Sequence, residues 1–249
     1  MSREIIAVKN LKVAYGDFVL FDDINFTVNE KDIFIIMGAS GCGKSSMLRV
    51  LTGLVTPVQG KVMIDGKDFS GADDAAKTEI MKSCGVLYQS GALFSSMTLK
   101  ENVAMPLELY TAYTPKEIDE LASYKLALTG LYGFEDFYPS EISGGMKKRA
   151  ALSRALALDP KIVYCDEPSA GLDPISSKRL DDLISELNQN LGTTFVIVTH
   201  ELQSLLSIGT NSIFLDNSVK NITGRGNPQE LLRNPPNDTI REFLTRGKK

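Results

Sequence analysis

The spacing of hydrophobic residues predicts two strands near the start of the chain. Residues 5–15 and 18–28 are rich in β-branched and aromatic side chains, and the pair Gly16-Asp17 separates them as a turn. A continuous apolar run follows from Asp32 to Met37, which is typical of a strand buried on both faces.

A glycine-rich loop follows this run, and after it the pattern takes the period of a helix. Residues 45–54 place Met47, Leu51 and Leu54 on one predicted helical stripe. Beyond it the pattern predicts a strand, a helix and a strand, in that order, at residues 61–65, 73–83 and 84–89.

From about Ser90 to Asp159 the pattern becomes mostly helical. Thr114 and Glu117 form a capping box with Pro115 at the first helical position, so a helix should begin there. After Pro160, strands are expected at 161–165 and 193–200, on either side of a helix that begins at Asp173. That helix carries apolar residues at helical spacing, namely Leu180, Leu183, Ile184, Leu187 and Leu191.

Strands that alternate with helices imply a mainly parallel sheet with helices on both faces. We therefore predict the α/β class and a single domain over residues 1–249. Its α/β core should comprise 1–89 and 160–225, and a helical insertion should occupy 90–159. Residues 226–249 should form a short helical tail with a basic end.

Composition narrows the possible functions. A chain that is 43% hydrophobic and 23% charged describes a globular protein with a real core. The net charge of −4 argues against a protein built to coat nucleic acid, so no nucleic-acid partner is expected. The cysteines Cys42, Cys84 and Cys165 lie far apart, which indicates reduced thiols. The start of the chain has no apolar signal-peptide core, and no apolar run approaches the ~20 residues of a spanning helix.

The strongest chemical signal is the loop after the buried run. Residues 38–45 read GASGCGKS and match the phosphate-loop pattern GxxxxGK[ST] between a strand and a helix. Glycines let backbone N–H groups turn inward around phosphate oxygens, and the helix N-terminus adds its positive end. An ordinary glycine turn is the alternative, which the flanking elements disfavour. We predict nucleotide contacts from Gly38, Ser40, Gly41, Cys42, Gly43, Lys44, Ser45 and Ser46.

Four further polar residues follow predicted strands, at the edge where open α/β sheets bind ligands. Asp166 and Ser45 suit a Mg²⁺ ion, and Glu167 could deprotonate an attacking water, although an acidic pair here is also typical of a helix cap. His200, the single histidine, could contact the γ-phosphate, and a structural role is the alternative. Gln89 could touch the Mg²⁺ ion or the water, or simply end a strand.

A second anion site is indicated at the start of a basic helix. Ser143, Gly144 and Gly145 present a hydroxyl and bare N–H groups, and the cationic run 147–149 follows. Positive side chains in a first turn oppose the helix dipole, so we expect something negative there. The chain already has one phosphate loop, which suggests a phosphate supplied from elsewhere.

Together these residues resemble the nucleotide-binding subunit of an ABC transporter. The phosphate loop corresponds to Walker A, IVYCDE to Walker B, and ISGGM stands where the signature LSGGQ is usual. The resemblance implies that Gln89 is the Q-loop residue, Asp173 the D-loop aspartate and His200 the switch histidine. Tyr15 matches the aromatic residue that stacks on adenine, or else is a plain strand tyrosine.

The resemblance also implies a fold and an activity. The fold would be a P-loop NTPase core with an antiparallel β subdomain and an inserted helical subdomain. The activity would be a Mg²⁺-dependent ATPase, with ATP and Mg²⁺ bound between two copies arranged head to tail. Ser143 and Gly145 of one copy would then contact the γ-phosphate held by Lys44 of the other.

Met146 departs from the glutamine that is usual in the family. With the surrounding segments at 87–107 and 143–160, it is similar to the ATPases of Mla/Mce-type phospholipid transporters. That similarity implies integral permease subunits, a Mce-domain lipid-binding protein, a peripheral position on the cytoplasmic face of the inner membrane, and no direct contact with cargo. Four apolar residues could receive a permease coupling helix or pack within the helical insertion, namely Leu93, Phe94, Met97 and Leu99.

Three other functions remain open at this point. One is the ATPase of an importer for polar solutes such as amino acids. Another is a soluble ABC ATPase that acts in cluster assembly. A third is a P-loop kinase, which would need neither a signature motif nor a dimer.

Overall fold

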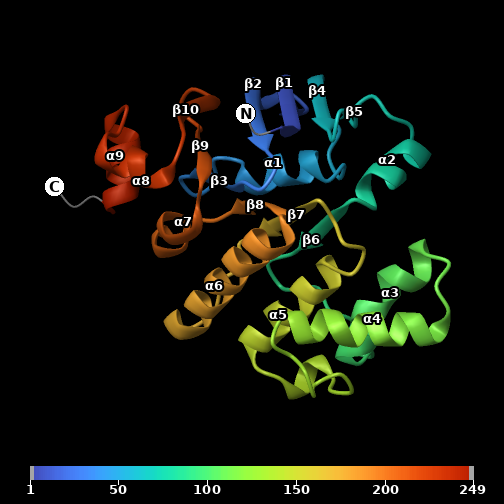
Figure 1. The fold of residues 1–249 in the computed structure, drawn as a ribbon. Helices are drawn as coiled ribbons and strands as arrows, with labels where there is room; N and C mark the ends of the chain where they lie inside the picture. The colour runs from blue at the N-terminus through green and yellow to red at the C-terminus, as the bar shows by residue number, and fades with distance from the viewer. Residues whose placement is uncertain (1–2, 247–249) are drawn as a thin grey trace. The chain divides into compact units, whose positions relative to one another are not determined.

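The computed structural model describes residues 3–246, which form two compact units (Figure 1). The first unit contains the residues up to Met81 together with those from Thr194 onward. The second unit runs from Lys82 to Thr193. The prediction of a single domain with a helical insertion over residues 90–159 stays a prediction.

The first unit contains an antiparallel sheet of four strands in the order β2-β1-β4-β5 (Figure 1). Its strands are β1 (Glu4–Tyr15), β2 (Phe18–Asn29), β4 (Gln59–Ile64) and β5 (Lys67–Asp68). The predicted turn lies between β1 and β2, where Gly16 has a positive φ of 58°. The second halves of β1 and β2 alternate in burial, as expected for a sheet with one buried face, whereas β1 begins with four consecutive buried residues, 5–8.

The strand ahead of the phosphate loop is buried along its whole length, as the continuous apolar run predicts. It is β3 (Ile33–Gly38), and it pairs in parallel with β8 (Thr194–Val198) on one side and β9 (Asn211–Asp216) on the other. Strand β10 (Asn221–Arg225) adds an antiparallel edge on β9. Central parallel strands of this kind deliver their C-terminal ends to one edge.

The helices of the first unit are α1 (Lys44–Leu51), α2 (Asp74–Met81), α7 (Leu202–Ile208), α8 (Pro228–Arg233) and α9 (Asp238–Thr245). The prediction that Leu54 shares a helical stripe with Met47 and Leu51 was wrong, because α1 ends before Leu54, which is 63% exposed. Helix α1 stops at Leu51 since Gly53 takes a left-handed φ of 77°, and the Leu54 N–H donates to the Arg49 carbonyl. The basic end predicted for the tail, residues 247–249, lies outside the described residues.

The second unit joins a parallel strand pair to several helices. Strands β6 (Cys84–Leu87) and β7 (Ile162–Asp166) pair from Cys84 opposite Ile162 to Leu87 opposite Cys165. Strand β6 therefore ends before Gln89, two residues earlier than predicted, because its ladder with β7 stops at Leu87. The helices are α3 (Leu99–Tyr110), α4 (Pro115–Leu128), the 3₁₀ turn η1 (Pro139–Glu141), α5 (Gly144–Ala155) and α6 (Pro174–Leu191).

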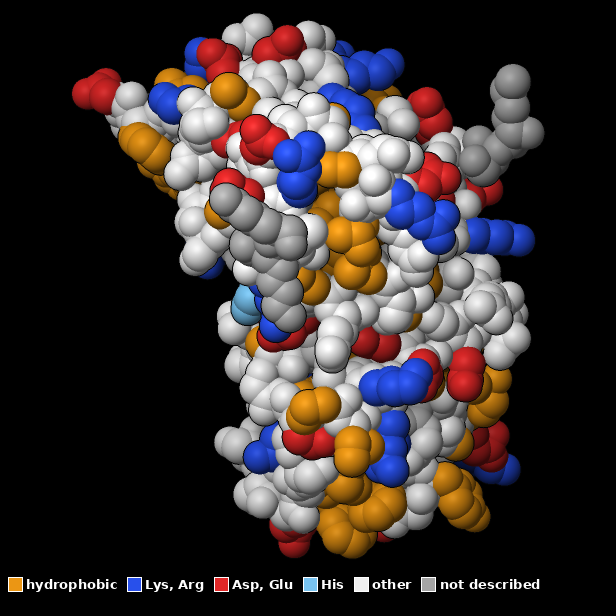
Figure 2. Space-filling model, turned by 90° about the vertical axis from the view of Figure 1, so that its left-hand side faces the viewer, with side chains coloured by type: hydrophobic (Ala, Val, Ile, Leu, Met, Phe, Trp, Pro, Cys, Tyr) orange, Lys and Arg blue, Asp and Glu red, His pale blue; other side chains and the backbone are white. Residues whose placement is uncertain are grey.

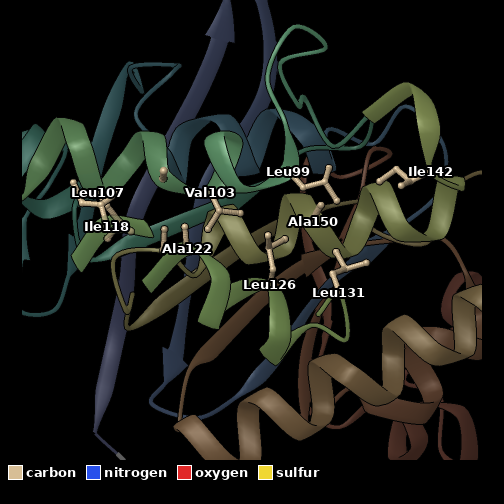
Figure 3. Close-up of a cluster of buried hydrophobic side chains, with 11 residues drawn as sticks. Leu99, Val103, Leu107, Ile118, Ala122, Leu126, Leu131, Ile142 and Ala150 are labelled. Carbon is tan, nitrogen blue, oxygen red and sulfur yellow. The ribbon is translucent and has the colours of Figure 1, made fainter. Parts of the chain in front are cut away.

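Helices α3, α4 and α5 share a hydrophobic core (Figure 3). Val103, Leu107, Leu126 and Ala150 lie within it, each at most 1% exposed. The predicted capping box at Thr114 is present and starts α4, and an equivalent box at Thr98 starts α3. The mostly helical character predicted for this part of the chain is thus confirmed.

Helix α6 begins after Asp173 as predicted, and Leu180, Ile184 and Leu187 are buried along it. Leu191 lies on the helix as predicted, and its side chain is 47% exposed. It is the last residue of the helix, and Gly192 leaves the helical conformation with a left-handed φ of 71°.

The shared core of α3, α4 and α5 predicts the cost of a cavity. Leu126→Ala should lower the free energy of unfolding by about 2–5 kcal/mol, because a fully buried leucine is truncated. Leu109→Ala, in α3 but 65% exposed, is the matched control and should change it by less than about 0.5 kcal/mol. Urea titration followed by circular dichroism measures both; equal effects would contradict the core as described.

Candidate functional site

The loop between β3 and α1 has the backbone of a phosphate cradle. Gly38, Gly41 and Gly43 all have positive φ, at 152°, 77° and 97°. Lys44 opens α1 and is only 8% exposed, and its Nζ donates to the carbonyls of Gly38 and Ala39 at 3.0 Å each. The loop therefore curls around a buried ammonium group, which is the charge that a phosphate would meet.

Packing explains two of these glycines, and open space surrounds the third. A Cβ at Gly38 would lie 2.4 Å from the Leu215 carbonyl oxygen, and one at Gly43 would lie 2.5 Å from Phe21 Cζ. A Cβ at Gly41 would meet nothing within 4 Å. The loop is thus tightly backed by the protein and open at Gly41, so a ligand has room to approach there.

The other loop residues predicted to contact nucleotide fall into two groups. Cys42 is 2% exposed, and burial raises the pKa of its thiol while the neighbouring Lys44 lowers it. A contact by Cys42 would therefore come from its backbone. Ser40 is exposed, whereas Ser45 and Ser46 are half-buried.

Tyr15 lies beside the first turn of α1. Its ring is 48% exposed, and its hydroxyl oxygen is 3.5 Å from Ser46 Oγ. An exposed ring next to the phosphate loop fits the predicted adenine contact, which stays a prediction.

His200 follows β8 and reaches the molecular surface (pale blue in Figure 2). Its side chain is 59% exposed, and Nε2 lies 4.0 Å from Glu201 Oε1. An exposed imidazole is accessible to a ligand, and its predicted phosphate contact stays a prediction.

The acidic pair of the second unit sits where β7 ends. Asp166 is the last residue of the strand and is half-buried, and Glu167 is 8% exposed. Glu167 has a left-handed φ of 47°, a conformation that costs a non-glycine residue about 1–2 kcal/mol. Such strain is concentrated at functional sites. Its carbonyl accepts a hydrogen bond from the Ala170 N–H at 3.1 Å, which closes the turn.

Gln89 and Glu167 are joined through a residue that the sequence reasoning did not single out. Lys148 is 6% exposed, and its Nζ donates to the Gln89 carbonyl and, at 3.4 Å, to the Glu167 carbonyl. Burial lowers the pKa of Lys148, against the opposing effects of Cys165, Glu167 and Asp166. The alternation of basic and apolar residues in α5 carries no signal that would identify this position.

Two of the three cationic residues at the start of α5, Lys148 and Arg149, have partners within the protein, and the external anion expected beside the run 147–149 stays a prediction. Arg149 Nη1 donates to the carbonyls of Thr129 and Gly130 at 3.0 and 2.9 Å, and Lys148 is bound as described above. Backbone carbonyls at the end of α4 and at the two turns thus take up these charges. The N-terminus of the helix is the feature that the predicted anion would meet.

Ser143 is the N-cap of α5, and its Oγ accepts the Met146 N–H at 3.2 Å. Ser143 and Gly144 are exposed and Gly145 is half-buried, so the helix start is accessible. The Met146 side chain packs against the core of α3, α4 and α5. A thioether suits that apolar contact, and its packing leaves the helix start to Ser143 and the backbone.

Asp173 is the N-cap of α6, and its carboxylate accepts the N–H groups of Ser176 and Ile175 at 3.0 Å each. Hydrogen bonding to Ser176 is the main reason that the pKa of Asp173 is lowered. The capping role is thus established, and a nucleotide contact by Asp173 stays a prediction.

The four apolar residues after Gln89 were expected either to receive a permease coupling helix or to pack within the helical insertion. Leu99 is fully buried and Leu93 packs beside it in the helical core. Phe94 is 49% exposed and Met97 is half-buried. Internal packing therefore explains Leu93 and Leu99, while Phe94 is available to a partner.

Comparisons with known proteins identify the family of the chain. A family model described as ABC transporter matches residues 21–170. The chain belongs to the ABC transporter family. This cassette is 40% identical over 239 residues to the probable ribonucleotide transport ATP-binding protein mkl of Mycobacterium tuberculosis. The aligned region covers 96% of the cassette and 66% of mkl. It thus spans about two-thirds of that relative. It is also 38% identical to the intermembrane phospholipid transport system ATP-binding protein MlaF of Escherichia coli, over 96% of the cassette and 88% of MlaF.

Solved structures give the same fold. The dimeric ATP-binding cassette MJ0796, in a post-hydrolysis state bound to ADP and Pi, is 30% identical with a TM-score of 0.81, over 90% of this cassette and 98% of that chain. The structure of cbiO1 from Clostridium perfringens is 26% identical with a TM-score of 0.86, over 98% of this cassette and 96% of that chain. The predicted P-loop NTPase fold is confirmed, with its antiparallel sheet and mixed sheet.

The different surroundings of two loop glycines predict different defects. Gly41→Ala should lose ATP affinity, because its methyl group projects into the open face of the cradle, and its structural cost should be limited to the backbone strain of a positive φ, about 1–2 kcal/mol. Gly43→Ala should lose more thermal stability, because its methyl group would also overlap the Phe21 ring. Thermal melts and ATP titration calorimetry separate the two effects. Wild-type ATP affinity in Gly41→Ala would show that ATP does not use this face.

Proposed function

We propose that the chain is the ATP-binding and ATP-hydrolysing subunit of a membrane ABC transporter that moves phospholipid. The observation that carries the proposal is the phosphate loop, where three positive-φ glycines curl around the buried Lys44 ammonium. Bare N–H groups, a helix N-terminus and a lysine together form a site for the phosphates of a nucleotide.

The residues present fit a bound Mg²⁺ ion. Ser45, Asp166 and Gln89 offer oxygen atoms, which are the ligands that Mg²⁺ requires. A sparse oxygen set suits an ion that keeps several waters and binds phosphate. Once bound, the ion supplies neutralisation of charge on the phosphate oxygens.

The chain's own residues divide the remaining work. Lys44 exchanges its carbonyl partners for phosphate oxygens and so holds the nucleotide. Glu167, fixed in a strained turn, accepts the proton of the attacking water as a general base. His200 and the Gln89 side chain orient the γ-phosphate and the water. Tyr15 stacks on adenine.

We further infer that two copies act head to tail. The similar cassette MJ0796 is dimeric in its ADP- and Pi-bound state, which supports a paired arrangement. The exposed helix start at Ser143 then serves a phosphate held by Lys44 of the second copy, with Gly144, Gly145 and Asp173 completing the contact. A P-loop kinase would need no such pairing.

A mixing experiment tests catalysis and pairing at once. Lys44→Ala and Ser143→Arg should each abolish ATP hydrolysis, since each damages both sites of a homodimer. An equal mixture should recover about a quarter of wild-type turnover, because half of the dimers are mixed and each of those has one intact site. Phosphate release measures it.

Ser140→Arg, on the exposed 3₁₀ turn just before Ser143, is the control for adding an arginine there. It should keep its own activity. If the Lys44→Ala and Ser143→Arg mixture stays inactive while Ser140→Arg turns over ATP, the head-to-tail arrangement is wrong.

The cargo follows from the relatives. MlaF is named as part of an intermembrane phospholipid transport system, and this chain matches 88% of its length, against 66% of mkl, which is named for ribonucleotide transport. Within residues 3–246 no helix has the length and apolar character needed to cross a bilayer. We therefore propose that integral permease subunits carry the cargo, together with a Mce-domain protein, and that the ATPase lies on the cytoplasmic face of the inner membrane.

A tagged chain purified from native membranes in mild detergent should bring a permease, a Mce-domain protein and phospholipid with it. Phe94→Asp should release the permease, because Phe94 is the exposed apolar residue after the Q-loop. Val219→Asp, also at an exposed apolar position, should not. Mass spectrometry identifies the partners.

The composition of the complex decides between cargo classes. A permease found with a solute-binding protein or a nucleotide would replace phospholipid by a polar solute. A soluble assembly scaffold without a permease would overturn the transport function.

A further inference from the structure

Basic side chains of helix α5 bind a series of backbone carbonyls in the loop after β6. Lys148 Nζ donates to the Gln89 carbonyl. One turn and a half later, Arg154 Nη2 and Nη1 donate to the carbonyls of Gly91 and Ala92 at 2.9 and 2.7 Å. The loop lies so close to the helix that a Cβ at Gly91 would be 3.4 Å from Ala151 Cβ. The helix that starts with the signature motif therefore fixes the path of the loop.

Lys148 differs from Arg154 because it has a second partner outside this loop. Its ammonium also donates to the carbonyl of Glu167 at 3.4 Å, in the left-handed turn at the end of β7. A lysine has three N–H donors, so it can hold both carbonyls at once. At 6% exposure the group is shielded from water, and nearby water therefore offers little replacement for these bonds.

We propose that Lys148 is a positioning residue that ties the Gln89 loop and the Glu167 turn to the signature helix. The role rests on the proposed ATPase function and extends it to a residue outside the recognised motifs. Strands β6 and β7 already pair up to Leu87 and Cys165, and beyond that point the ammonium group of Lys148 carries a displacement of the loop, such as a membrane partner would impose, to the Glu167 backbone. The carboxylate of Glu167 then takes its catalytic position only while the loop is in place.

Loss of the Lys148 ammonium should affect ATP turnover and ATP affinity differently. The Gly38–Ser45 loop belongs to the other unit and keeps its own hydrogen bonds when Lys148 is altered. ATP affinity should therefore change little. The Glu167 turn, which needs external support to keep its strained backbone, should lose its alignment, and misplacement of a catalytic group by about 1 Å costs roughly 100-fold in rate.

Lys148→Met keeps the aliphatic stem and removes the donors. In the full chain, kcat for ATP should fall by about 10- to 100-fold while KM stays within about twofold. Lys148→Arg should restore most of kcat, because a guanidinium keeps several donors at similar reach. If Lys148→Met does not fold, Lys148→Gln provides the same comparison. A Glu167→Gln chain sets the lower limit of turnover.

Two further variants separate positioning from general damage. Lys125 is another buried lysine of the second unit, 3% exposed and 2.5 Å from Asp159, and contacts neither turn. Lys125→Met should lower the melting temperature and keep kcat. Arg154→Met releases the Gly91 and Ala92 carbonyls but leaves Glu167 held, so its kcat should fall less than that of Lys148→Met.

The outcomes decide the proposal. Wild-type kcat in Lys148→Met, or equal losses in Lys148→Met and Lys148→Arg, would overturn it. An Arg154→Met defect as large as that of Lys148→Met would show that the loop alone matters and would remove the link to Glu167. If the wild-type chain failed to hydrolyse ATP in the same assay, the proposed function itself would be refuted. A failure of the Lys148 proposal can therefore be told apart from a failure of the proposed function.

Discussion

The backbone at Gly43 is the constraint on which the nucleotide site depends. The chain leaves β3, a strand buried at every residue, and must start α1 at once. It does so through a left-handed residue at a point where Phe21 leaves no space for a Cβ. Only glycine fits both conditions. The turn then brings Lys44 back over its own loop, so the cationic group and the bare N–H groups face the same region.

The second unit also has accessible helix N-termini, but side-chain caps form them instead of a glycine turn. Helices α5 and α6 begin with side-chain caps at Ser143 and Asp173, and both starts are exposed. Lys148, Arg149 and Arg154 of α5 donate to backbone carbonyls of the neighbouring turns and of the loop after β6, which holds these segments against the helix. Electrostatic attraction thus holds these segments in place, and the exposed N-terminus of α5 is accessible to a ligand.

Local signals in the sequence were enough for the motifs and for most elements. Capping boxes and the phosphate-loop pattern act within a few residues, so Thr114, Asp173 and the Gly38–Ser45 loop could be read directly. The failure at Leu54 has a local cause, since the left-handed Gly53 ends the helix before this residue and the periodic pattern runs past that point. The role of Lys148 was not predictable, because its partners are 59 and 19 residues away and are backbone atoms.

The two helix caps of the second unit differ in a way that bears on what each can recognise. Aspartate and serine cap a helix about equally well, and both accept N–H groups here. A carboxylate has only lone pairs to offer. A hydroxyl that accepts the Met146 N–H still has its own proton, which it can donate to another group. Serine at residue 143 therefore ends α5 with a donor where aspartate would have placed a negative charge, and this choice makes the helix start attractive to an anion.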